Sequence, residues 1–155
     1  MTTATLPARA RTLDESAAIA TSRADLGIAV LRVILGLVFA AHGAQKIFVF
    51  GFDGVAASFG QMGVPLAGLV GPAVALGELL GGIALMAGVL TRVVAPLLAL
   101  IMIGATMLVH LPNGFFAPNG IEFTLTLLAG AVALALTGAG RYSLDRMIAL
   151  KRGES

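Results

Sequence analysis

Long apolar runs separated by short polar segments dominate this chain. The first run, residues 26–50, has about 25 residues and would measure about 37 Å as a helix, enough to cross a bilayer with some tilt. Three further runs follow at residues 64–87, 92–110 and 121–137. The pattern predicts an all-α protein, in which residues 25–146 form an integral membrane four-helix bundle.

The segments outside these runs are polar or short. Residues 52–63 cannot span, but Phe52, Val55 and Phe59 recur at near-helical spacing, so we expect a short interfacial segment between the first and second spans. Residues 1–24 are expected to form a mobile cytoplasmic tail and residues 147–155 a cytoplasmic C-terminal tail. A cleaved signal peptide is not expected, because the first apolar run is too long.

The basic residues predict the orientation. With four spans, both termini and the second connection lie on one side, whereas the first and third connections hold no Lys or Arg. Positive charge concentrates on the cytoplasmic side of membrane proteins, so both termini should be cytoplasmic. The basic residues on that side are Arg9, Arg11, Arg23, Arg92, Arg141, Arg146, Lys151 and Arg152.

Composition supports a membrane protein and excludes some chemistry. The chain is 58% hydrophobic and 12% charged, whereas soluble domains have about 25% charged residues. Its basic residues form no continuous stripe, so we expect no nucleic-acid partner. There is no cysteine, which excludes disulfides, thiolate catalysis and thiolate-ligated metal centres within the chain.

Three ionisable residues lie within the first run. At 100° per residue, Lys46 lies about 40° and His42 about 80° around the helix from Arg32, so all three share one side. Charged groups inside a membrane are costly and turn toward a protein interior, where they find partners. The sequence therefore predicts a bundle with a polar interior.

An inner layer of this interior is predicted from depth. Arg32 lies about 9 Å from the start of the first run, and Glu78 about 13 Å from the end of the second, on the same half of the membrane. A buried charge is tolerable when paired, so we expect a buried Arg32–Glu78 ion pair. Gly77 and Gly81 beside Glu78 would let another helix approach closely.

An outer layer holds His42, Lys46, His110 and Glu122. We expect these four side chains to form a small polar pocket that opens to the non-cytoplasmic side, with Lys46 and Glu122 as its ion pair. Structural alternatives stay open for each: Glu122 as a helix cap, His110 as an interfacial residue, and Lys46 as a side chain reaching outward to water.

Short motifs follow one another across residues 29–146. They are Leu31 and Arg32; His42, Gly43 and Lys46; Gly63 and Pro65; Glu78, Gly81 and Gly82; Gly88, Thr91 and Arg92; His110, Gly114 and Phe115; Gly120 and Glu122; and Gly138, Gly140, Ser143, Leu144 and Asp145. In their order and spacing these motifs resemble the DoxX family.

The resemblance implies a four-helix protein of the bacterial plasma (inner) membrane. Some relatives belong to thiosulfate:quinone oxidoreductases, and others are linked to membrane redox complexes that handle thiols or oxidative stress. The positions matching the family's polar motif, and hence the candidate catalytic residues, are His42, Lys46, Glu78, His110 and Glu122. The resemblance further implies a redox partner protein, a quinone as the candidate cofactor, no covalent cofactor and no metal.

Other functions remain open at this point. The polar residues of a non-catalytic scaffold subunit would only lock the helices in register. A small transporter would need a homo-oligomer, because four helices leave little room for a path within one chain. A haem held by His42 and His110 is a further alternative, since these are the only histidines.

Overall fold

The computed structural model of the chain describes residues 8–153, with side chains from residue 19 onward. Every regular element in this range is helical, and no strand occurs in it. The elements are α1 (Ala8–Gln45), the π-helical turn η1 (Lys46–Phe50), α2 (Gly51–Gln61), α3 (Ala67–Ala87), α4 (Thr91–Ala105), the π-helical turn η2 (Thr106–His110), the short 3-10 helix η3 (Leu111–Asn113), α5 (Glu122–Thr137) and α6 (Leu144–Lys151).

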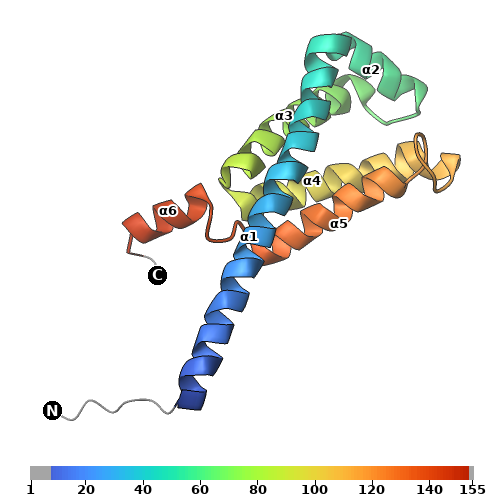
Figure 1. Cartoon of the computed structure of the whole chain (residues 1–155). Coiled ribbons are helices and arrows are strands. Elements are labelled where there is room, and N and C mark those ends of the chain that lie inside the picture. Colours follow the sequence, from blue (N-terminus) through green and yellow to red (C-terminus); the bar gives the residue numbers. More distant parts are fainter. Residues whose placement is uncertain (1–7, 154–155) are drawn as a thin grey trace.

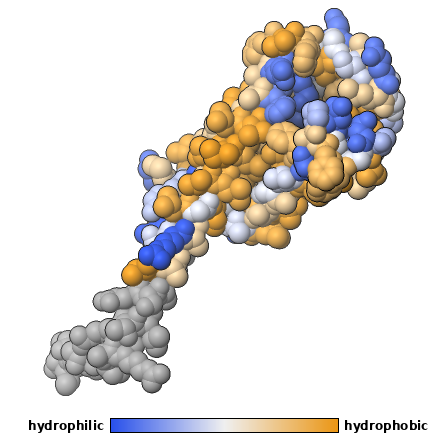
Figure 2. All heavy atoms as spheres, turned by 45° about the vertical axis from the view of Figure 1, so that its right-hand side comes forward, coloured by the Kyte–Doolittle hydropathy of each residue, from blue (hydrophilic) through white to orange (hydrophobic). Residues whose placement is uncertain are grey.

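Membrane-spanning helices account for most of the chain. Three helical segments, Ile19–Gln61, Ala67–Ala87 and Thr91–Asn113, are long and apolar enough to cross a membrane, and α5 is a shorter apolar helix. Figure 2 shows a broad apolar band along the molecule, with polar residues gathered toward its ends. These features confirm the predicted all-α fold of a membrane helical bundle.

The four main helices form two pairs. Helix α1 lies along α3, and α4 lies along α5 (Figure 1). The pairs meet near the α3–α4 turn and diverge toward the end that carries α2. The two pairs therefore lie closest together near the α3–α4 turn.

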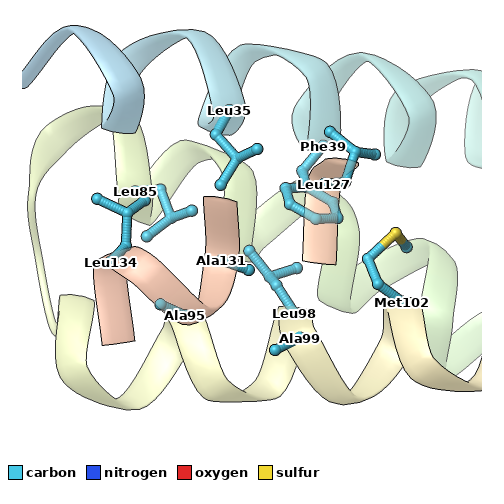
Figure 3. Packing of buried hydrophobic residues seen from close by; sticks show 10 residues of the cluster. All are labelled: Leu35, Phe39, Leu85, Ala95, Leu98, Ala99, Met102, Leu127, Ala131 and Leu134. Carbon is cyan, nitrogen blue, oxygen red and sulfur yellow. The ribbon is translucent and has the colours of Figure 1, made fainter. Parts of the chain in front are cut away.

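The hydrophobic core lies where all four helices meet (Figure 3). Ala95 on α4 and Ala131 on α5 are fully buried, and such small side chains let these two helices approach closely. The other core residues are Leu35 and Phe39 from α1, Leu85 from α3, Leu98, Ala99 and Met102 from α4, and Leu127 and Leu134 from α5.

Glycines bring α1 and α3 into backbone contact. A Cβ atom on Gly43 would lie 2.3 Å from the backbone nitrogen of Leu79, and one on Gly82 would lie 2.4 Å from that of Ala40. Gly77 and Gly81, singled out from the sequence, instead face the side chains of α4. The register between α1 and α3 is therefore set by Gly43 and Gly82 together with Gly36, whose Cβ would meet the carbonyl oxygen of Gly82.

We expect Gly43→Ala to lower the free energy of unfolding in detergent by about 1–3 kcal/mol, because the opposing atoms belong to the backbone and cannot rotate away. Gly104→Ala on α4 is the matched control, since its Cβ would meet nothing within 4 Å. Equal stability of the two variants in thermal unfolding would show that close α1–α3 contact does not hold the bundle together.

The helix boundaries differ from the predicted domain limits at both ends. Helix α1 begins at Ala8, so residues 8–24 of the predicted tail are helical, while residues 1–7 lie outside the described range. Helix α6 crosses the predicted limit at residue 146. Helix α2 occupies the predicted interfacial segment and follows a break at Gly51, where φ is 70°.

Candidate functional site

An ion pair inside the bundle joins α1 to α3. The Lys46 ammonium donates a hydrogen bond to the Glu78 carboxylate. The Glu78 side chain is only 4% exposed and the Lys46 side chain 19%. Gly43 faces Leu79 on α3, and the Lys46 side chain, one turn further on, leans back toward the start of its helix and so reaches Glu78.

Arg32 does not pair with Glu78, so that prediction is wrong. Its Nη1 donates to the carbonyl oxygens of Leu85 (2.7 Å) and Met86 (3.1 Å), and its Nη2 donates to that of Tyr142 (2.6 Å). These contacts tie α1 to the carboxyl end of α3 and to the segment before α6. The Leu85 carbonyl also accepts the capping N–H of Gly88 (3.0 Å), so Arg32 is its second donor.

The error lies in the assumed register of α1 against α3. The prediction takes the membrane depths of Arg32 and Glu78 from the ends of their apolar runs. Helix α1 extends well before its run, and the glycine contacts fix which residues of α1 and α3 face each other. Gly36 faces Gly82 and Met86, so Arg32, one turn earlier, lies beside the end of α3 rather than beside Glu78. Gly88 leaves room for the guanidinium, because a Cβ there would lie 2.2 Å from Nη1 of Arg32.

The predicted Lys46–Glu122 ion pair is also wrong, because Lys46 is bound to Glu78. Glu122 begins α5, and its Oε1 accepts a hydrogen bond of 2.8 Å from the backbone N–H of Ala117 in the preceding loop. A carboxylate at a helix N-terminus is also favoured by the helix dipole. Glu122 therefore has a local contact, as a structural residue would, but it binds the preceding loop and does not cap α5, which has no side-chain cap hydrogen bond.

A cavity of about 680 Å³ lies between the diverging helix pairs. His42, Lys46, Glu78 and His110 all line it, whereas Glu122 does not. The structure thus brings together four of the five candidate site residues. Much of the remaining wall is apolar and includes Phe39, Phe50, Phe59, Met62, Met102 and Phe123.

The two histidines have different surroundings in this wall. The His42 ring contacts the Phe123 ring, with centroids 5.6 Å apart and planes inclined by 46°. His110 Nδ1 lies 2.7 Å from the carbonyl oxygen of Asn119. A carbonyl only accepts, so Nδ1 donates this hydrogen bond, and Nε2 is the ring nitrogen left for another partner.

Two threonines beside the cavity were missed from the sequence. Thr106 Oγ1 donates to the carbonyl oxygen of Met102 (2.7 Å) and lies 2.9 Å from Thr124 Oγ1. Both threonines are buried, and Thr124 lines the cavity. Their presence within apolar runs is the signal that could have found them, since buried hydroxyls need partners.

This architecture defines a class of protein. Ionisable residues held inside a helical membrane bundle line functional sites or ion pathways rather than facing lipid. A largely apolar cavity with a few convergent polar groups is the usual form of a small-molecule site. The chain is therefore a multi-pass membrane protein whose bundle holds a largely apolar cavity lined by a few ionisable residues.

The chain belongs to the DoxX family, whose family model matches residues 27–111. The match contains Arg32, His42, Lys46, Glu78 and His110 and confirms the resemblance seen in the sequence. No solved structure gives a significant match.

Named relatives cover most of the chain. A protein of Bacillus subtilis (strain 168) named "Putative oxidoreductase CatD" is 36% identical over 124 residues, which are 80% of this chain and 88% of the relative. The "Inner membrane protein YqjF" of Escherichia coli (strain K12) is 36% identical over 126 residues, which are 80% of this chain and 93% of the relative. Together with the apolar helices, these relatives place this protein in a lipid bilayer.

Proposed function

We propose that this DoxX-family protein is the quinone-binding membrane subunit of an oxidoreductase complex, and that its cavity holds the quinone head group. The observation that carries the proposal is the convergence of Lys46, Glu78, His42 and His110 on one cavity with largely apolar walls. The resemblance to redox-linked relatives suggests that the complex handles thiols or oxidative stress.

The size and lining of the cavity support a quinone. A volume of about 680 Å³ lies within the usual range of small-molecule sites, roughly 300–1,000 Å³. Aromatic and methionine side chains suit a planar ring with an apolar tail. The lysine ammonium has three N–H donors, of which Glu78 uses one, so Lys46 retains donors for a quinone carbonyl oxygen.

The histidines supply the proton chemistry of this proposal. Reducing a quinone to a quinol adds electrons and protons to its carbonyl oxygens, and imidazole is the side chain best suited to exchange protons near neutral pH. His42 and His110 would bind these oxygens and hold or pass the protons. The electrons would come from a partner protein that carries an electron-transfer centre. The name of the Bacillus subtilis relative describes that protein as an oxidoreductase, which agrees with this role.

We expect His42→Leu and His110→Leu each to weaken binding of a short-tailed quinone about tenfold, since leucine cannot hydrogen-bond and losing one hydrogen bond costs roughly 1–1.5 kcal/mol. Calorimetric titration of the detergent-solubilised protein measures this. Glu122→Gln is the control, because it removes an ionisable family residue that does not line the cavity. If both histidine variants bind the quinone as tightly as the parent, the histidines do not take part in quinone binding.

The cavity is expected to open toward the non-cytoplasmic side. The positive-inside rule places the basic ends of the chain in the cytoplasm, and the cavity lies at the end of the bundle that carries α2.

Reporter fusions test this orientation. A reporter after Ser155 should be cytoplasmic and one after Pro118 should be non-cytoplasmic, as seen with a paired phosphatase and fluorescent-protein assay. The same sidedness for both fusions would contradict the four-span topology.

A further inference from the structure

Helix α6 combines exposed apolar and basic side chains. Leu144, Met147, Ile148 and Leu150 are 42–56% exposed. At 100° per residue, the first three fall within an arc of about 100°. Arg146, Lys151 and Arg152 are also exposed. Figure 1 shows α6 projecting from the end of the bundle, away from α1.

Hydrogen bonds fix the start of α6 on the bundle. The Asp145 backbone N–H donates to the carbonyl oxygen of Gly88 (2.9 Å), and its carboxylate accepts from the backbone N–H groups of Leu90 (2.8 Å) and Thr91 (3.0 Å). Ser143 caps α6 by accepting from the backbone N–H of Arg146 (3.2 Å). The helix is therefore held at the α3–α4 turn.

The basic side chains of this segment form no ion pair with the two carboxylates beside it, Asp25 and Asp145; Asp25 accepts a hydrogen bond of 3.2 Å from the backbone N–H of Arg141. Between residues 139 and 153 the basic residues are Arg141, Arg146, Lys151 and Arg152, against a single acid, Asp145. Asp145 is occupied by the α4 backbone, and within residues 19–153 the one ion pair is Lys46–Glu78. These four basic side chains are therefore exposed and have no acidic partner among residues 19–153.

We infer that α6 is an interfacial anchor that binds anionic phospholipid head groups. A helix with an apolar arc and basic flanks lies in the plane of the membrane surface, its apolar side among the upper acyl chains and its cations at the phosphates. Lys151 lies within the apolar arc, and its long stem can reach from there to the head groups. The inference is independent of what the cavity binds.

A tryptophan probe tests the inference directly, because the chain contains no tryptophan. The full-length Met147→Trp protein is placed in two nanodisc preparations of identical lipid composition, a mixture of phosphatidylglycerol and phosphatidylcholine. Bromine on acyl chains quenches tryptophan fluorescence. In one preparation the brominated lipid is the anionic phosphatidylglycerol, and in the other it is the zwitterionic phosphatidylcholine. One Lys or Arg near an anionic surface favours anionic lipid roughly fivefold, so we expect at least that enrichment beside α6. Bromine on the anionic lipid should therefore quench the tryptophan fluorescence more strongly.

Charge variants identify the source of the enrichment. In the same probe background, Arg146→Gln/Lys151→Gln/Arg152→Gln should remove the difference between the two preparations while the probe stays quenched. The control Arg9→Gln/Arg11→Gln/Arg23→Gln removes equal charge elsewhere and should keep the difference. Equal quenching by both lipids in the parent, no quenching by either, or an equal loss in both triple variants would overturn the inference.

Discussion

Lys46→Met is expected to lower the free energy of unfolding by about 3–5 kcal/mol, because removing one partner of a buried ion pair leaves the other charge uncompensated. The charge left behind is Glu78, whose side chain is 4% exposed and whose partner in the structure is Lys46. Chemical unfolding of the protein in mild detergent measures the change.

The double variant Lys46→Met/Glu78→Met is the informative comparison. Replacing both members of a buried pair with apolar side chains is often neutral, so this variant should recover most of the lost stability. If the double variant is as unstable as Lys46→Met, the pair does not account for the loss. A double variant that is stable but no longer binds quinone would show that the pair serves the ligand as well as the fold.

The second large effect is expected at Arg32. Arg32→Met removes charge-assisted hydrogen bonds to three carbonyl oxygens in a buried position. We expect the free energy of unfolding to fall by about 3–5 kcal/mol. Each such bond contributes roughly 1.5–3 kcal/mol, and the carbonyls regain part of this when the structure relaxes. Arg32→Lys should rescue only part of this loss, because an ammonium lacks the planar fork of guanidinium donors.

Arg92→Met is the control for Arg32, because Arg92 is an exposed arginine of the same bundle end. Thermal unfolding of the three variants in one detergent compares them. If Arg32→Met unfolds at the same temperature as Arg92→Met, Arg32 does not join α1 to the end of α3 as described.

The fold could be predicted because each feature that determines it lies within one short stretch of the sequence. Long apolar runs dictate spanning helices, since a backbone in lipid must satisfy its own hydrogen bonds. The partial burial of Lys46 likewise follows from helical periodicity and the cost of exposing charge to lipid, whereas His42 lines the cavity but is exposed. These arguments need no knowledge of how one helix meets another.

The partners of the charged residues could not be predicted in the same way. They depend on the register of α1 against α3, which Gly36, Gly43 and Gly82 set through backbone contact. Arg32 and Lys46 lie 14 residues, or about four helical turns, apart on α1, so the register decides which of them meets Glu78, and the ends of an apolar run do not fix that register. The partner of Glu122 was predicted wrongly because its carboxylate bonds locally to the Ala117 backbone and not to Lys46.

The quinone content of the protein purified gently from its native membrane tests the central claim most directly. Organic extraction followed by chromatography and mass spectrometry should recover roughly one quinone per chain from the parent, as expected for a single cavity, and much less from the His42→Leu/His110→Leu variant. Recovery of no quinone from the folded parent, or equal amounts from parent and variant, would contradict the assignment of the cavity as a quinone site.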